Sequence, residues 1–263
     1  MRGRGDVTVA ERPPLLSIVT ICFNSAATIG DTFASVRRER DPRVEYVVID
    51  GGSTDATPEL MRANADLIDA SLSEPDRGTS DALNKGARLA RGTYLWFVNS
   101  DDTIEPGAVA VVLERLEAED PATPLMLIGQ TRYVSRDGTP LRMLTCDAAG
   151  LERILEYNPI PYPSTVQSRA LFQRAGGFAA DFEIVNDYEY FLRALALRPR
   201  VAFLDRVLAV MRDGGQSSSS ASLSNRLRHQ VELFRVQRRH RSFARACLGQ
   251  VARFGNWVRG PAQ

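Results

Sequence analysis

The sequence has almost no lysine: of its 33 lysine and arginine residues, only Lys85 is a lysine. Cysteine is scarce as well, because Cys22, Cys146 and Cys247 lie far apart and form no CxxC pair. This spacing argues against a disulfide framework or a structural zinc site and favours a reducing compartment. The cleanest apolar run covers only 108–113, far short of the roughly 20 residues that cross a bilayer. We therefore expect a cytoplasmic protein without a transmembrane segment.

The overall composition is that of a soluble globular protein. Of 263 residues, 44 % are hydrophobic and 25 % are charged, which argues against a disordered or collagen-like chain. The net charge of +1 hides an uneven distribution. Residues 223–259 contain nine arginines and one glutamate, a charge of +8, so the rest of the chain carries −7. Residues 1–14 are polar and lack an apolar core, so we expect a flexible N-terminus and no signal peptide.

Up to about residue 118, short apolar strands alternate with amphipathic helices. We expect strands at 15–23, 43–50, 67–72 and 94–98, and helices after the cap residues Asn24 and Ser25, from Pro58, over 79–90 and from Pro106. Such alternation predicts βαβ units in an α/β fold, with a mostly parallel sheet and helices on both faces.

The second half of the chain is less regular. We expect antiparallel strands at 125–133 and 140–144, a helix at 148–157, a proline loop at 158–164, helices at 171–175 and 187–197, and a strand at 201–210. Residues 15–118 and 119–216 are predicted to form two halves of one domain. Residues 217–263 are predicted to be a serine-rich linker followed by a basic, amphipathic helical extension.

Acidic side chains follow several of the predicted strands. Asp50, Asp76 and the pair Asp101–Asp102 each come just after a strand, and the carboxyl ends of parallel strands are where such sheets bind ligands. The Asn99–Asp102 stretch, NSDD, suits a hard divalent cation, although Ser100 or Asp101 could instead cap the next helix. No Gly-x-Gly-x-x-Gly or P-loop element follows a strand, which argues against NAD-type and P-loop nucleotide sites.

Four polar residues, Asp50 among them, each allow two interpretations. Asp50 could accept hydrogen bonds from a nucleotide base or ribose, or simply form a turn with the glycine after it. Lys85 could have a specific role, because an arginine-rich chain would be expected to use arginine for a solvated charge, or it could only form an i,i+4 ion pair with the acid at position 81. Asp187 could be a general base or a helix N-cap. Arg212 could bring a guanidinium fork to a diphosphate, or belong to a plain turn.

Four motifs in a fixed order carry a family resemblance. They are SIVTICFN, VVIDGGSTD, EPDRGTSDALNKGARLARGTYLWFVNSDD and GGF…NDYEYFLR. Over about 15–216 the chain resembles the family-2 glycosyltransferases of the GT-A fold, and within them bacterial members that build cell-surface polysaccharide or glycolipid. The resemblance implies inverting transfer from a nucleotide-diphosphate sugar, with UDP as the default nucleotide and dTDP or GDP still open. It also implies Mn²⁺ or Mg²⁺ and a saccharide or lipid-linked acceptor.

The resemblance also implies roles for particular residues. Residues 15–118 would bind the nucleotide sugar, and 119–216 would bind the acceptor and provide the base, Asp187. Asp101 and Asp102 would be the metal-binding carboxylates. The implied nucleotide-sugar contacts are Thr20, Asn24, Asp50, Asp76, Arg77, Lys85, Asn99, Ser100 and Arg212.

The chain departs from the family pattern at four positions. Asn99 replaces the first aspartate of the Asp-x-Asp element, Gly51 replaces an aspartate, Asn186 replaces a glutamate, and Tyr162 stands where related sequences often have histidine. These changes support one alternative function, a GT-A-like protein that binds a nucleotide sugar or a partner without catalysis. The intact Asp101 and Asp187 favour the enzyme.

The basic C-terminal stretch has apolar residues at helical spacing. They are Leu223, Leu227, Val231, Phe234, Phe243, Cys247, Val251, Phe254 and Val258. The pattern over 223–259 fits a helix on an anionic membrane surface, which would place the protein on the inner face of the cell membrane. It equally fits a helix packed on its own domain or on the partner in a homodimer. No nucleic-acid-binding motif accompanies the positive charge, so we expect no nucleic-acid partner.

Overall fold

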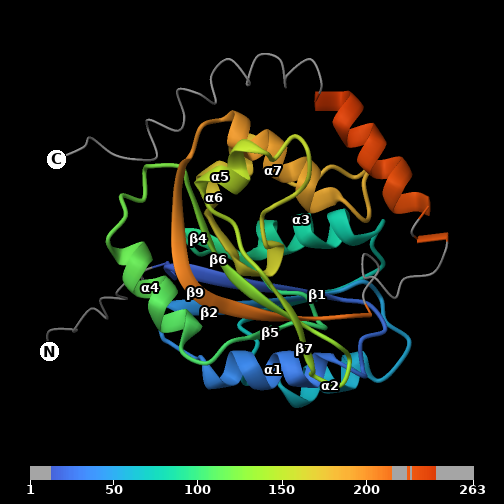
Figure 1. Cartoon of the computed structure of the whole chain (residues 1–263). Coiled ribbons are helices and arrows are strands. Elements are labelled where there is room, and N and C mark those ends of the chain that lie inside the picture. The colour runs from blue at the N-terminus through green and yellow to red at the C-terminus, as the bar shows by residue number, and fades with distance from the viewer. Residues whose placement is uncertain (1–12, 215–223, 226, 241–263) are drawn as a thin grey trace, which may run out of the picture.

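The computed structural model describes residues 13–214, 224–225 and 227–240 (Figure 1). In this part of the chain nine strands form one sheet in the order β3-β2-β1-β4-β8-β6-β9-β5, with β7 paired to β6. The strands are β1 (Leu16–Cys22), β2 (Val44–Asp50), β3 (Ala70–Ser73), β4 (Tyr94–Phe97), β5 (Thr103–Ile104), β6 (Leu125–Val134), β7 (Pro140–Leu144), β8 (Thr165–Ser168) and β9 (Arg200–Arg212).

Helices cover both faces of this sheet, as predicted (Figure 1). They are α1 (Ile29–Arg38), α2 (Thr57–Ala63), α3 (Thr79–Leu89), α4 (Ala108–Glu117), α5 (Ala148–Glu152), α6 (Arg169–Ala175) and α7 (Asn186–Ala196), with a 3-10 turn, η1, at Tyr162–Ser164. Residues 224–225 and 227–240 are also helical.

The core forms one layer on each side of the sheet. Successive residues of a strand point to opposite faces, so Ile18 packs in the layer with α1, α2 and α4, while Val19 packs in the layer with α3, α5, α6 and α7. Burial on both faces explains why the central strands are continuous apolar runs without alternation.

The strand directions bring the functional edge together. β3, β2, β1 and β4 are parallel neighbours, and β6 and β9 run in the same direction because the antiparallel strand β8 lies between β4 and β6. The carboxyl ends of these six strands therefore lie along one edge of the sheet.

Two of the predicted boundaries are wrong, and the strands β5 and β8 were not predicted. The third strand begins at Ala70 rather than residue 67, because Leu67 is buried in the turn before it. The helix expected over 148–157 ends at Glu152 and continues as turns. The strand β8 falls directly after the proline loop, where no strand was predicted.

The basic tail is described only in part. Its serine-rich linker and the second apolar row, from Phe243 to Val258, lie outside the described residues. Among the residues that are described, no helix is both long enough and apolar enough to cross a membrane.

Candidate active site

Asp50 ends β2 and is held rigidly at the edge of the sheet. Its carboxylate is fully buried and accepts hydrogen bonds from the Ser73 hydroxyl at 2.6 Å and the Ser53 amide at 3.1 Å. The Asn24 side-chain oxygen accepts from the Thr54 amide at 2.9 Å, which joins the loop after β1 to the loop after β2. Asn24 and Ser25 are not the helix caps that were expected, since α1 begins at Ile29 and its N-cap residue is Thr28.

The Asp76 carboxylate occupies the space beside Gly51. A Cβ atom added at Gly51 would lie only 2.4 Å from Asp76 Oδ2. Asp76 Oδ1 also accepts a hydrogen bond from the Gly78 amide at 3.0 Å. A side chain at position 51 would therefore displace the Asp76 carboxylate.

Lys85 contacts the loop that carries Asp76 through a hydrogen bond and an ion pair. Its ammonium is almost buried, donates to the Pro75 carbonyl at 2.9 Å and pairs with Glu74 at 3.0 Å. The i,i+4 pair with Asp81 exists but is longer, at 3.6 Å. Arg77 on the same loop has an 87 % exposed side chain, which leaves its guanidinium accessible to a ligand.

The loop after β4 joins the same edge. Ser100 donates from its hydroxyl to the Ser25 hydroxyl at 2.8 Å, which connects it to the loop after β1. Neither Ser100 nor Asp101 caps the next helix, because Gly107 is the N-cap residue of α4. Asn99 is partly buried beside them. Thr20 lies deeper, fully buried in β1, with its hydroxyl accepting from Tyr46 at 3.0 Å.

Asp101 and Asp102 form an electrostatically costly pair. Burial raises the pKa of Asp101, while the positive charge of Arg212 partly opposes that shift. Burial and the negative charge of Asp101 raise the pKa of Asp102 well above its usual range. Arg212 reaches this region from the end of β9 and pairs with Asp31 on α1 at 2.6 Å.

The donor chemistry at Asp101 and Asp102 fits a divalent cation. No group of three or more histidine, cysteine or acidic side chains within 13–214, 224–225 and 227–240 is arranged to hold a metal ion. Mg²⁺ usually binds through one or two carboxylates together with substrate phosphates rather than in an all-protein cage. Asp101 and Asp102 are two adjacent carboxylates, and the charge of Asp101 disfavours the ionised form of Asp102.

Asp187 lies in the first turn of α7. It is partly exposed, and its carboxylate accepts from the Tyr188 amide at 2.7 Å and from the Asn158 side-chain amide at 3.1 Å. Burial raises the pKa of Asp187 to about 6, although these hydrogen bonds oppose the shift. The alternative role as N-cap is excluded, because Val185 occupies that position.

Tyr162 connects the two acidic regions. Its ring stacks on Phe97 with a centroid distance of 6.4 Å, and its buried hydroxyl has no hydrogen-bond partner among the described residues. Burial raises the pKa of Tyr162 well above its usual range, and the negative charges of Asp187 and Asp102 add to the shift. Asp187 and Asp102, from two distant parts of the chain, therefore both lie near one phenol.

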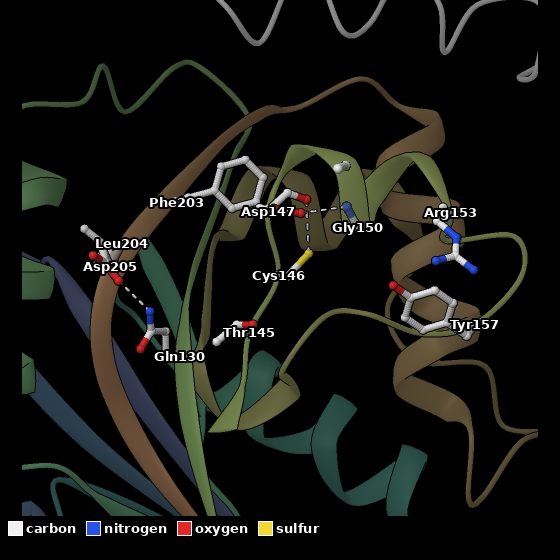
Figure 2. Close-up of a pocket in the computed structure, with 11 residues that line it drawn as sticks. Gln130, Thr145, Cys146, Asp147, Gly150, Arg153, Tyr157, Phe203, Leu204 and Asp205 are labelled. Atoms are coloured by element: carbon white, nitrogen blue, oxygen red, sulfur yellow. Dashed lines mark hydrogen bonds between the residues drawn. The ribbon is translucent and has the colours of Figure 1, made fainter. Parts of the chain in front are cut away.

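A separate cavity of about 630 Å³ lies between α5 and the irregular part of β9 (Figure 2). Ile128 pairs with Phe203 but Gln130 with Val207, so β9 bulges here, and Asp205 accepts a hydrogen bond from Gln130 at 2.6 Å. None of the predicted site residues lines this cavity. The cavity is therefore distinct from the strand-end cluster.

Several residues at the strand-end edge were missed by sequence reasoning. Ser73 and Asn158 hold predicted site residues in place but belong to no motif that marks them, and Ser25, which holds Ser100, was expected only as a helix cap. Glu232 is a fourth, and it contacts the segment just before α7. One signal pointed to it, because it is the single acid among the nine arginines of the tail.

Comparison with known proteins identifies the family of the chain. The model of the family described as "Glycosyl transferase family 2" matches residues 17–179. An uncharacterised glycosyltransferase of Mycobacterium tuberculosis is 34 % identical over 184 residues, which cover 69 % of each chain. The succinoglycan biosynthesis protein ExoO of Rhizobium meliloti is 31 % identical over 169 residues, covering 64 % of this chain and 46 % of the relative.

Solved structures show the same fold. S. aureus TarS in complex with UDP-GlcNAc matches with a TM-score of 0.65 at 20 % identity, over 79 % of this chain and 61 % of that one. The mannosyltransferase PcManGT of Pyrobaculum calidifontis, in complex with GDP-Man and Mn²⁺, matches with a TM-score of 0.55 at 22 % identity, over 76 % and 57 %. The predicted GT-A-type sheet is therefore confirmed.

Proposed function

Since the chain belongs to glycosyl transferase family 2, we propose that it transfers a sugar from a nucleotide-diphosphate sugar to a hydroxyl of a saccharide or lipid-linked acceptor. The observation that carries the proposal is a carboxylate of near-neutral pKa, Asp187, beside Asn186, which hydrogen-bonds Ser80 at the start of α3, just after the loop that carries Asp76. The complex of TarS with UDP-GlcNAc makes UDP-sugars the first donors to test. A role in cell-surface polysaccharide or glycolipid synthesis is supported by the name of the succinoglycan relative.

The reaction we propose is a single inverting displacement. The acceptor hydroxyl oxygen attacks the anomeric carbon while the bond from that carbon to the diphosphate oxygen breaks. The nucleoside diphosphate leaves with the bonding electrons, and Asp187 takes the acceptor proton. Such general-base assistance contributes roughly 10²–10⁴-fold to a rate. A base with a pKa of about 6 is largely ionised at pH 7 yet still basic enough to accept the proton.

The remaining residues would bind and orient the donor. Asp50, fixed by its two hydrogen bonds, is suited to accept from a base or ribose donor, and Arg77 has an accessible guanidinium. Asp101, with Asp102 beside it, would hold Mn²⁺ or Mg²⁺. When bound, this ion supplies charge neutralisation to the diphosphate. Arg212 would add a fixed positive charge from the end of β9.

A thermal-shift screen of nucleotide sugars with Mn²⁺ tests the binding part of the proposal. A ligand at 100 times its Kd stabilises the folded state by about 2.7 kcal/mol. That corresponds to roughly 5–10 °C in Tm for a chain of this size. If no nucleotide or nucleotide sugar changes Tm, the proposal is wrong. Binding without release of nucleoside diphosphate would support the non-catalytic alternative.

We also propose that the C-terminal helix binds an anionic membrane surface. Leu227, Val231 and Phe234 are 59–60 % exposed and form one stripe, while the opposite side of the helix packs on the domain. Replacing all three by serine should reduce flotation with anionic liposomes. The matched control replaces exposed Leu141 and Met143 of β7 by serine. Equal flotation of both variants and the unaltered protein would exclude this proposal.

A further inference from the structure

The helix over 227–240 packs against the segment that leads into α7, which carries Asp187 (Figure 1). We propose that Glu232 of this helix is a positioning residue, whose carboxylate holds the start of α7 through main-chain hydrogen bonds. The inference rests on the proposed function, because it takes Asp187 to be the base.

The Glu232 carboxylate accepts hydrogen bonds from three consecutive main-chain amides. Its Oε2 atom accepts from Glu183 at 3.2 Å, from Ile184 at 2.8 Å and from Val185 at 3.2 Å. The side chain belongs to a residue that is only 5 % exposed. Val185 is the N-cap residue of α7 and makes no side-chain cap of its own. Glu232 thus supplies from another helix the negative charge and the acceptor that a helix N-terminus favours.

Two ion pairs near Glu232 are weaker than its hydrogen bonds, because they lie between exposed side chains. Arg228 pairs with Glu183 at 2.6 Å, and Arg239 pairs with Asp181 at 3.4 Å, but all four side chains are about half exposed. Exposed ion pairs of this kind contribute about 0–1 kcal/mol each. Arg239 and His240 of the same helix also lie 3.5 Å from the buried carboxylate of Glu189 on α7, but Glu232 is the side chain that accepts from the amides just before Asp187.

The same segment is held from its other side by α3. The Ser80 hydroxyl donates to the Phe182 carbonyl at 2.9 Å and accepts from the Asn186 side-chain amide at 3.1 Å. Residues 182–186 therefore lie between α3 and the C-terminal helix, and Asp187 is the next residue. Without Glu232, three amides lose their acceptor on one side, and the segment can relax toward solvent.

A shift of this segment would reach the base directly. A 1 Å misplacement of a catalytic group can lower a rate by about 10²-fold. Glu232→Ala should therefore lower kcat by about 10- to 100-fold while donor KM stays within about 2-fold. Glu232→Gln keeps an acceptor oxygen and should recover most of the rate. A purely structural role would lower Tm without separating kcat from KM.

The experiment compares four forms of the full chain: unaltered, Glu232→Ala, Glu232→Gln and a control, Glu114→Ala, at an exposed acid on α4. Steady-state release of nucleoside diphosphate from the donor found by thermal shift gives kcat and KM. Hydrogen exchange reports the amides of residues 183–185, which should exchange faster in Glu232→Ala. The ¹³C shift of the Asp187 carboxyl reports its pKa, which should fall from about 6 as the site opens to water.

The last two measurements need no donor. If no form turns over any donor, the proposed function fails, while exchange and the Asp187 titration still test the contact and its effect on the base. Unchanged exchange and an unchanged Asp187 titration in Glu232→Ala would overturn the inference. A Glu232→Ala variant with wild-type kcat would overturn it as well.

Discussion

Replacing Asp187 by asparagine should make the protein more stable and inactive. Burial raises the pKa of this carboxyl from 3.8 to about 6, so at neutral pH the fold holds an ionised group in surroundings that disfavour it. An amide has nearly the same shape and no charge to bury. The substitution therefore removes a destabilising charge together with the proposed base.

The size of the gain follows from the pKa shift. A difference of about two pKa units corresponds to about 3 kcal/mol. Against this, Asn158 donates to Asp187 Oδ2, and losing that hydrogen bond costs about 1 kcal/mol. The net gain is about 2 kcal/mol at pH 7.5, or roughly 4–8 °C in Tm.

The pH dependence gives this prediction a sign that can be checked. Between pH 3.8 and about 6 the folded state binds more protons at Asp187 than the unfolded state does. The stability contributed by this group is therefore fully present below pH 3.8 and is lost as pH rises through 6. The advantage of Asp187→Asn should be complete above pH 6 and vanish near pH 4.

Urea unfolding at pH 7.5 and pH 4.5 measures both effects. Asp147→Asn is the matched control, because Asp147 is exposed and caps α5, where asparagine caps equally well. We expect no comparable gain from the control at either pH. If Asp187→Asn is less stable than the unaltered protein at pH 7.5, or gains as much at pH 4.5, the reasoning about burial is wrong.

Three further substitutions test the donor site by calorimetry. Gly51→Ala should weaken nucleotide binding by about 10-fold, because the added methyl turns the Asp76 carboxylate away. The free energy of unfolding should change by less than about 1 kcal/mol, since that carboxylate can rotate. Normal nucleotide affinity would contradict the role of Asp76. Lys85→Ala should also weaken binding, by releasing the loop at Pro75, and an effect on Tm alone would make Lys85 purely structural. Asp101→Ala should abolish the Mn²⁺-dependent part of nucleotide binding, and retained Mn²⁺ dependence would exclude it as a ligand.

Much of the fold follows from the sequence because its local signals agree with the packing. The alternation of apolar strands and amphipathic helices predicts the parallel half of the sheet. The strand β8 escaped prediction because its four residues, TVQS, include three polar ones and lack the apolar alternation of a strand. Its polar side chains are buried only because β4 and β6 pair on both of its sides.

The tail shows a different limit of sequence reasoning. The spacing of Leu227, Val231 and Phe234 correctly indicates a helix, but these residues are exposed. The face that packs on the domain contains Glu232 and Val236. Glu232 lies on this face because its carboxylate accepts hydrogen bonds from the three amides just before α7. Periodicity predicts the helix, whereas the partner that covers a face depends on contacts far away in the sequence.

The candidate site also combines features that the sequence predicts with features that it does not. Acids at the ends of parallel strands could be placed together in advance, because those ends share an edge. The residues that surround these acids could not be predicted. Asn158 donates to Asp187 from 29 positions away, and Tyr162 lies near two acids from different halves of the chain.

The pH profile of nucleoside diphosphate release, measured with the donor found by thermal shift, tests the central claim most directly. With Asp187 as the base, kcat should fall about tenfold per pH unit below about 6. Asp187→Asn should bind the donor normally and lose most turnover at every pH. Wild-type turnover by Asp187→Asn would contradict the account.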